Sequence, residues 1–206
     1  RPFHALRYNT ERYANLAPVL APPYDIIKGE EQDALYARDP KNVIRLEYGK
    51  QSPADTADDN RYTRARTDLI DWLTDGTLVM EQQPCFYPHR QRFSWGSQTF
   101  ERNGFFAAVE LTRFDEGDVL PHEWTLKGPK EDRLKLMRAC QASFSPVFGL
   151  YDGKDSRIGE VLQGVTGGNP LAIADGFNFH EMLWRVDDAA LCAAIADDLA
   201  ARKILI

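Results

Sequence analysis

Two stretches rich in aromatic residues, separated by a short turn signal, constrain the fold of this chain more than any other feature. The stretches are Cys85–Phe93 and Thr99–Leu111, and Ser94-Trp95-Gly96-Ser97 joins them. Apolar runs on either side of a glycine-containing turn predict a β-hairpin. The second stretch is apolar on both faces, with Phe105, Ala107 and Val109 on one and Phe100, Phe106 and Ala108 on the other. Such a pattern is typical of a central strand, so we expect this strand to lie inside a mixed sheet.

Helical and extended patterns alternate along the rest of the chain. An apolar stripe at helical spacing predicts a helix over 61–74 that ends at Gly76 and packs by its Tyr62, Leu69 and Trp72 side. The patterns also predict helices over 29–37 and 158–162 and a last helix capped by Asp187-Asp188, with further strands over 3–9, 43–48, 146–151 and 179–186. The fold class is therefore α+β, a mixed, largely antiparallel sheet with flanking helices.

Length and composition bound the function classes. The 206 residues are enough for one full core or two small ones, and we expect a single domain. A content of 43% hydrophobic and 27% charged residues is ordinary for a globular protein. The net charge of −6 makes nucleic acid an unlikely partner, since phosphate backbones need a clustered basic surface. The three cysteines are far apart and show no metal-ligand spacing, which favours a reducing, cytoplasmic compartment. No apolar run approaches the roughly 18 residues of a membrane span, and a homo-oligomer is left open.

The ends of the sequence suggest part of a longer chain. The first residue is not methionine, and the last three are Ile204-Leu205-Ile206. An apolar terminus of this kind is an aggregation hazard when left free. We therefore expect these residues to form a strand edge or to pair with another molecule.

A polar stretch, Pro121–Arg133, is the strongest candidate for a site. From His122 to Arg138 there are five Lys or Arg residues against three Asp or Glu. Gly128-Pro129 marks a helix start, where free N–H groups and the helix dipole favour an anion, and Lys127 and Lys130 flank that place. The alternative is an exposed, well-capped helix with a Glu131–Lys135 pair.

A second candidate stretch is the proline-set loop Ala21-Pro22-Pro23-Tyr24-Asp25. The two prolines exclude a regular helix or central strand, so the loop is extended and presents Tyr24 and Asp25 at its end. A structural turn is the alternative for this loop. We expect it to share one cleft with His122–Arg133, with Asp25 within about 20 Å of Lys130, the span of one small ligand.

Several stretches together resemble the bacterial and archaeal domain-of-unknown-function family 1015, over essentially the whole chain. They are Leu6-Arg7-Tyr8-Asn9, Ala21-Pro22-Pro23-Tyr24-Asp25, Asn42-Val43-Ile44-Arg45-Leu46, Pro121-His122-Glu123, Gly128-Pro129-Lys130-Glu131-Asp132-Arg133-Leu134 and Ser145-Pro146-Val147-Phe148-Gly149-Leu150-Tyr151. Family members continue into an Asp-Gly-His-His-Arg motif like that of the ParB/sulfiredoxin-like fold, which includes nucleotide-dependent kinases of free serine. This sequence ends before that motif. The resemblance implies a nucleotide or phosphate ligand, and an inactive fragment.

Three functions follow as hypotheses. The first is a phosphotransferase-type enzyme using ATP or ADP with magnesium, in which Lys127, Lys130 and Arg133 hold phosphates. His122 would act as the general base, and magnesium would bind Asp132, with Asp25 or Glu123 as alternatives; Asp25 and Glu123 are also catalytic candidates. The candidate ligand-binding residues are Tyr24, Arg45, Thr125, Lys127, Gly128, Lys130 and Arg133. The second hypothesis is a module that senses a small molecule without turnover, and the third, disfavoured by charge, is nucleic-acid binding.

Overall fold

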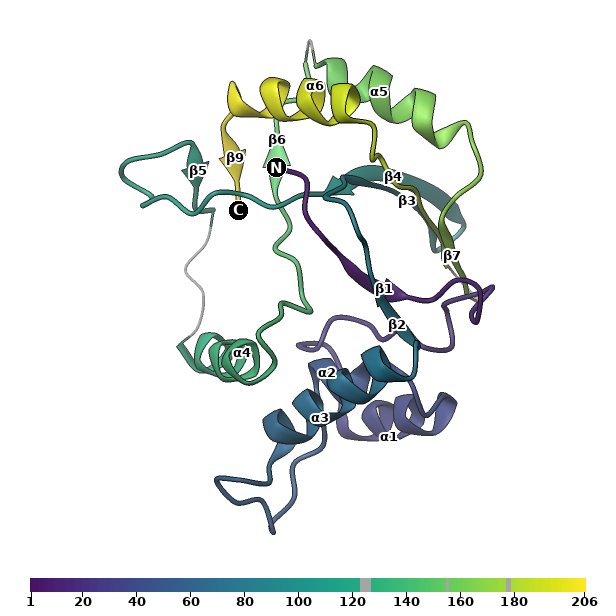
Figure 1. Cartoon of the computed structure of the whole chain (residues 1–206), viewed down its shortest axis with the longest axis vertical. Helices are drawn as coiled ribbons and strands as arrows, with labels where there is room; N and C mark the ends of the chain where they lie inside the picture. The colour runs from purple at the N-terminus through teal and green to yellow at the C-terminus, as the bar shows by residue number, and fades with distance from the viewer. Residues whose placement is uncertain (123–126, 155, 177–178) are drawn as a thin grey trace. The chain divides into compact units, whose positions relative to one another are not determined.

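The computed structural model describes residues 1–122, 127–154, 156–176 and 179–206 of the chain (Figure 1). It divides into two compact units, and each is described by itself. The sheet unit comprises Arg1–Asn15, Met80–Glu123 and Val147–Ile206, and the helical unit comprises Leu16–Val79 and Trp124–Pro146. The single domain suggested by chain length stays a prediction.

The secondary structure is α+β with largely antiparallel strands, as the sequence predicts. The helical unit contains α1 (Gly29–Arg38), α2 (Ile44–Glu47), α3 (Arg61–Thr74) and α4 (Lys127–Cys140). The sheet unit contains β1 (Leu6–Tyr8), β3 (Tyr87–Trp95), β4 (Gln98–Phe106), β5 (Val119–Leu120), β6 (Leu150–Tyr151), α5 (Arg157–Thr166), β7 (Ala172–Asp175), β8 (Phe179–Leu183), α6 (Ala189–Ala200) and β9 (Ile204–Leu205). Strand β2 (Leu78–Met80) runs across the boundary.

The predicted hairpin is the β3–β4 pair of a four-stranded antiparallel sheet with strand order β4-β3-β8-β7. The prediction that its second strand is central was wrong, because β4 is an edge and β3 lies inside. The first six residues of β4, Phe100 included, are exposed, and its last three are partly buried. There Phe105 packs against Phe86 and Tyr151 at ring distances of 6.1 and 6.0 Å, and Phe106 lies 5.5 Å from His89.

The C-terminal residues also differ from their expected place. Strand β9 is not an edge but the middle of a three-stranded sheet, parallel to β5 and antiparallel to β6. The backbone explains this: Ile204 N–H donates to Asp118, and Ile206 N–H donates to Leu120, at 2.7 and 2.8 Å. The apolar end is thus paired on both sides within its own unit, and the parallel β5–β9 pair makes the strand arrangement mixed.

Helices α5 and α6 lie side by side in the sheet unit and close its core (Figure 1). Ile158 of α5 and Ile195 of α6 are buried with Phe86 and Val186 from the sheet region. Asp188 caps α6 as predicted, since its carboxylate accepts the Leu191 N–H at 2.9 Å. Within the part of the chain that the structure describes, we find no helix both long and apolar enough to cross a membrane.

In the helical unit, α3 has the bounds that its apolar stripe predicts. Ala65, Leu69 and Trp72 are buried, and α3 packs on α2 and α4. Asn60 caps its first turn by accepting the N–H groups of Tyr62 and Thr63. Gly76 follows the last turn with φ of 74°, which a residue without Cβ adopts readily.

The predicted strand over 43–48 is instead the one-turn helix α2. Both Ile44 and Leu46 are buried, as they would also be in a half-buried strand. The deciding contacts come from Asn42, which is fully buried and whose side-chain amide donates to the carbonyls of Pro18 and Leu20 at 2.8 and 2.9 Å. Its oxygen accepts the Ile44 N–H at 3.0 Å. These bonds turn the chain where the sequence suggests extension.

We expect Asn42→Ala to lower the free energy of unfolding by about 2 kcal/mol, because buried groups lose their partners. Asn42→Asp should cost at least as much, since it keeps an acceptor for Ile44 but offers no donor to the two carbonyls. Urea unfolding followed by circular dichroism measures both. A loss below about 0.5 kcal/mol, typical of surface substitutions, would contradict this role for Asn42.

Candidate anion-binding site

The helical unit contains a pocket of about 290 Å³ that we call the basic pocket. Four cationic side chains line it: Arg45 of α2, Lys50 of the following loop, and Arg61 and Arg64 of α3. The other lining residues are Tyr36, Gly49, Gln51, Ser52 and Asp68. Cationic walls around a small hollow suit an anion.

The ring of Tyr36 positions two of these cations. The guanidinium of Arg45 lies 4.2 Å from the ring centre, and Lys50 Nζ lies 4.7 Å from it. Arg45 also donates to the carbonyls of Tyr36 and Pro40 at 2.9 and 2.8 Å. Lys50 forms an ion pair with Asp33. Arg45, a candidate ligand-binding residue from sequence, is therefore held firmly at the pocket wall.

Arg61 links the basic pocket to a second group of residues around Asp132. The Asp132 carboxylate accepts from Arg61, from the Tyr62 hydroxyl at 2.6 Å, and from Arg133 at 2.5 and 3.0 Å. Burial alone would raise the pKa of Asp132, but these hydrogen bonds and the two positive charges outweigh it and hold that pKa below its ordinary value. Arg61 Nε is buried and has no hydrogen-bond partner, so one charged donor stays unsatisfied.

One residue from each candidate stretch, Tyr24 and Arg133, is in contact within this unit. The guanidinium of Arg133 lies 3.9 Å from the centre of the Tyr24 ring and donates to the carbonyl of Glu47 at 2.9 Å. The hydroxyl of Ser145 donates to the Glu47 carboxylate. Residues from four of the resembling stretches or their immediate neighbours thus converge within 16–79 and 127–146.

Asp68 is the carboxylate among the lining residues of the basic pocket. It lies on α3, one turn after Arg64. Burial raises its pKa above the ordinary value, against the opposing charge of Arg45. A half-buried carboxyl with a raised pKa is suited to exchanging a proton with a bound molecule.

Several sequence candidates lie elsewhere. Asp25 is exposed in the turn before α1; Lys127, Gly128 and Lys130 are exposed in the first turn of α4, with Lys127 3.7 Å from Glu131. His122 belongs to the sheet unit, where it is exposed and its N–H donates to Ile206 at 2.8 Å. Glu123 and Thr125 lie outside the described residues. The roles predicted for these residues remain predictions.

Asp132 is poorly suited to the predicted magnesium site. Both of its oxygens already accept hydrogen bonds from positively charged or phenolic neighbours. Magnesium keeps several waters and needs open carboxylate oxygens. Among the described residues, no group of three or more His, Cys, Asp or Glu side chains is arranged to hold a metal ion.

Sequence reasoning missed Lys50, Arg61, Arg64 and Asp68. A usable signal was nevertheless present in α3, whose first turn contains no acidic residue and carries arginines instead. Helix dipoles favour acidic side chains at that end, so cations there run against the local preference. Such local conflicts are expected at functional sites.

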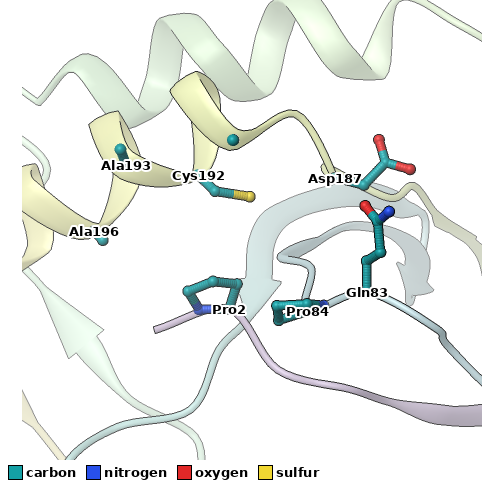
Figure 2. Close-up of a pocket in the computed structure, with 8 residues that line it drawn as sticks. Pro2, Gln83, Pro84, Asp187, Cys192, Ala193 and Ala196 are labelled. Atoms are coloured by element: carbon teal, nitrogen blue, oxygen red, sulfur yellow. The ribbon is translucent and has the colours of Figure 1, made fainter.

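The sheet unit has a larger hollow of about 430 Å³ with a different chemistry (Figure 2). Its lining is Pro2, Gln83, Pro84, Asp187, Ala189, Cys192, Ala193 and Ala196. The Cys192 thiol donates to the carbonyl of Val186 at 3.3 Å, and burial raises its pKa. A lining without a cationic side chain does not suit an anion, and none of the sequence candidates lies there.

Comparison with known proteins finds a match among family models. A family model described as "Protein of unknown function (DUF1015)" matches residues 1–206. No curated protein and no solved structure matches the chain. The match covers every stretch on which the sequence resemblance rests.

Proposed function

The chain belongs to the DUF1015 family, whose description states no function, and we propose that its helical unit binds a small phosphate-bearing metabolite in the basic pocket. The observation that carries this proposal is the set of four cationic side chains around one hollow. Arginine and lysine together are the usual partners of phosphate.

The volume of the basic pocket favours a small metabolite over a whole nucleotide. Its roughly 290 Å³ is at the lower end of ligand pockets, which span about 300–1,000 Å³. ATP or ADP would extend beyond it. Magnesium is not needed for this proposal, because the lining cations supply the positive charge.

A second candidate function is phosphoryl transfer, and Asp68 is the observation that favours it. A carboxyl with a raised pKa beside Arg45 suits general acid–base chemistry on a bound hydroxyl. The sequence assigned the general-base role to His122 and named Asp25 and Glu123 as further catalytic candidates. An assay for release or transfer of phosphate with an Asp68→Asn variant separates turnover from binding.

The free cysteines and the net charge agree with the other expectations from the sequence. Cys85, Cys140 and Cys192 are free thiols, in keeping with a reducing, cytoplasmic compartment. The net charge of −6 again argues for a small anion held in a local pocket rather than for nucleic acid. Assembly into a homo-oligomer stays open.

We expect Lys50→Gln to weaken the binding of inorganic phosphate about tenfold, because it removes one charged donor from the pocket wall. Isothermal titration of the full chain measures this. Lys135→Gln is the matched control, since Lys135 is exposed on α4 and does not line the pocket. Equal affinities for the two variants would contradict the proposal.

Lys130→Ala in the same series tests the helix start that the sequence favoured. If the ligand binds at the start of α4, this variant should lose about ten- to a hundredfold in affinity while Lys50→Gln does not. If the ligand binds in the basic pocket, Lys50→Gln should weaken binding and Lys130→Ala should leave the affinity nearly unchanged.

A further inference from the structure

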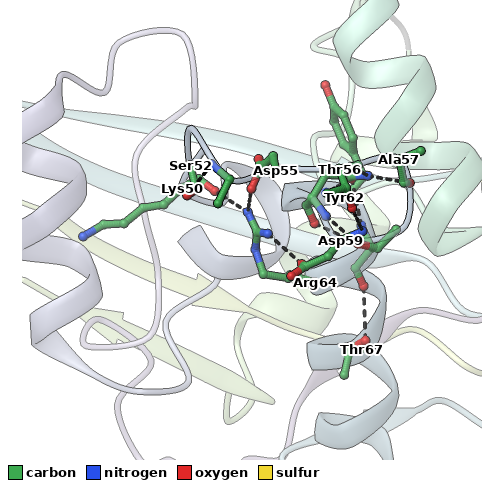
Figure 3. A network of polar contacts seen from close by, with 12 residues as sticks. Lys50, Ser52, Asp55, Thr56, Ala57, Asp59, Tyr62, Arg64 and Thr67 are labelled. Carbon is green, nitrogen blue, oxygen red and sulfur yellow. Dashed lines mark hydrogen bonds and ion pairs between the residues drawn. The ribbon is translucent and has the colours of Figure 1, made fainter.

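Arg64 in the basic pocket already holds anionic partners from its own unit (Figure 3). Its Nη1 donates to Asp59 at 2.8 Å, and its Nη2 donates to Asp55 at 2.9 Å and to the carbonyl of Lys50 at 3.0 Å. The hydrogen bonds that Arg64 donates to Asp59 and Asp55 raise the pKa of its guanidinium. The acidic loop between α2 and α3 therefore neutralises one of the four pocket cations.

The other pocket cations are held differently. Arg45 makes its side-chain hydrogen bonds to two backbone carbonyls, Lys50 pairs with one carboxylate, and Arg61 pairs with Asp132. In the described part of the chain, Arg64 is the pocket cation that contacts two separate carboxylates. Its side chain is also 41% exposed, so it can exchange partners without being withdrawn from a core.

From this arrangement, and resting on the proposed function, we infer that the ligand carries a phosphate monoester dianion, which binds by taking Arg64 from Asp55 and Asp59. A monoanion carries less negative charge than the two carboxylates together, so displacing them from Arg64 yields little binding free energy. A dianionic phosphate brings the same charge to one point and offers two oxygens to the guanidinium fork. The competition from Asp55 and Asp59 therefore determines which anions can bind to Arg64.

The exchange has a local structural consequence. Arg64 holds the loop over 51–59 through Asp55 and Asp59. Asn60 also holds it, because its side-chain amide donates to the carbonyls of Thr56 and Ala57 at 3.0 Å. Taking Arg64 away frees Asp55 and Asp59 but leaves the Asn60 contacts in place. Loop amides near Asp55 should then exchange hydrogen faster, while the capped amides of Tyr62 and Thr63 should not.

Two phosphate esters test this inference on the full chain at pH 8 and constant ionic strength. Methyl phosphate is a dianion there, because the second pKa of a phosphate monoester is about 6, whereas dimethyl phosphate is a monoanion. The variants are Asp55→Asn, Asp59→Asn and the double variant. Asp58→Asn is the matched control, with the same charge change in the same loop on an exposed residue that is not a partner of Arg64.

We expect the double variant to bind methyl phosphate about fivefold more tightly than the wild type, and Asp58→Asn to change little. Methyl phosphate should speed hydrogen exchange around Asp55 in the wild type, and dimethyl phosphate should not. In the double variant that exchange should already be fast without ligand. Circular dichroism confirms folding, and the single Asp59→Asn variant, at a side chain 74% exposed, serves if the double variant unfolds.

Two results would overturn the inference while leaving the proposed function standing. One is an equal gain in affinity for Asp58→Asn and for Asp55→Asn or Asp59→Asn, each of which removes one negative charge, because that result would reflect net charge alone. The other is unchanged or slower loop exchange when the wild type is saturated with methyl phosphate. Failure of both esters and of inorganic phosphate to bind any folded variant would overturn the proposed function as well.

Discussion

Asp132→Asn is expected to lower the free energy of unfolding by about 3–5 kcal/mol, the cost of removing one member of a buried ion pair. The carboxylate sits between Arg61 and Arg133, and the three side chains are only 16%, 15% and 18% exposed. The asparagine keeps the shape but leaves two guanidinium groups without a counter-charge. The Tyr62 hydroxyl also loses a charged acceptor.

Urea unfolding measures this loss, with Glu131→Gln as the control. Glu131 is the preceding residue of α4, is 58% exposed and makes one surface pair with Lys127, so its loss should cost no more than about 0.5 kcal/mol. Hydrogen exchange should rise in 16–79 and 127–146, where the partners of Asp132 lie. Similar losses for the two variants would show that the cluster does not stabilise the helical unit.

The same carboxylate gives the stability a defined dependence on pH. The folded-state pKa of Asp132 is lowered, so its contribution is present above the unfolded value of about 3.9 and is lost as pH falls through the folded value. Wild-type protein should therefore lose stability on acidification more steeply than Asp132→Asn. Unfolding free energies measured between pH 7 and pH 3 compare the two slopes.

The elements that could be predicted are those whose secondary structure is determined by their own residues rather than by contacts with distant residues. Helix α3 is long enough for its apolar stripe to fix a 3.6-residue period, so its bounds follow from the sequence. Four residues cannot fix a period, and the alternation of Ile44 and Leu46 with polar neighbours predicts a strand where the structure has α2. Its form depends on Asn42 bonding to carbonyls more than twenty residues earlier. Likewise β4 shows two apolar faces, but its neighbours in the sheet decide that it is an edge.

The candidate site could be predicted from the sequence only in part. The contact between Tyr24 and Arg133 joins the two stretches that the sequence singled out. The sequence singled them out because each is a loop set by proline that ends in polar side chains. Arg61 and Arg64 were missed because charged residues on a helix usually form its solvated face. What they do depends on a loop that returns Lys50 and Asp55 to α3, and a linear pattern does not encode that return.

The second large effect is expected in the sheet unit, at Glu81. This residue is buried, and its carboxylate accepts from Arg7 and from Arg185, the latter at 3.0 Å. Burial favours the neutral acid, but the two guanidinium groups outweigh it and lower the pKa of Glu81. Glu81→Gln should cost about 3 kcal/mol, at the lower end for a buried pair because the Arg185 side chain is 39% exposed.

Hydrogen exchange shows whether this loss is confined to one unit. With Glu81→Gln, exchange should rise in 1–15, 80–122 and 147–206, where Arg7 and Arg185 lie, and should change little in the helical unit. Glu110→Gln is the control, because Glu110 pairs with Arg1 in the same unit while 68% exposed. Asp132→Asn should give the opposite regional pattern. Uniform acceleration along the whole chain in both variants would mean that the two units unfold as one cooperative structure, and the single domain predicted from chain length would then describe the protein.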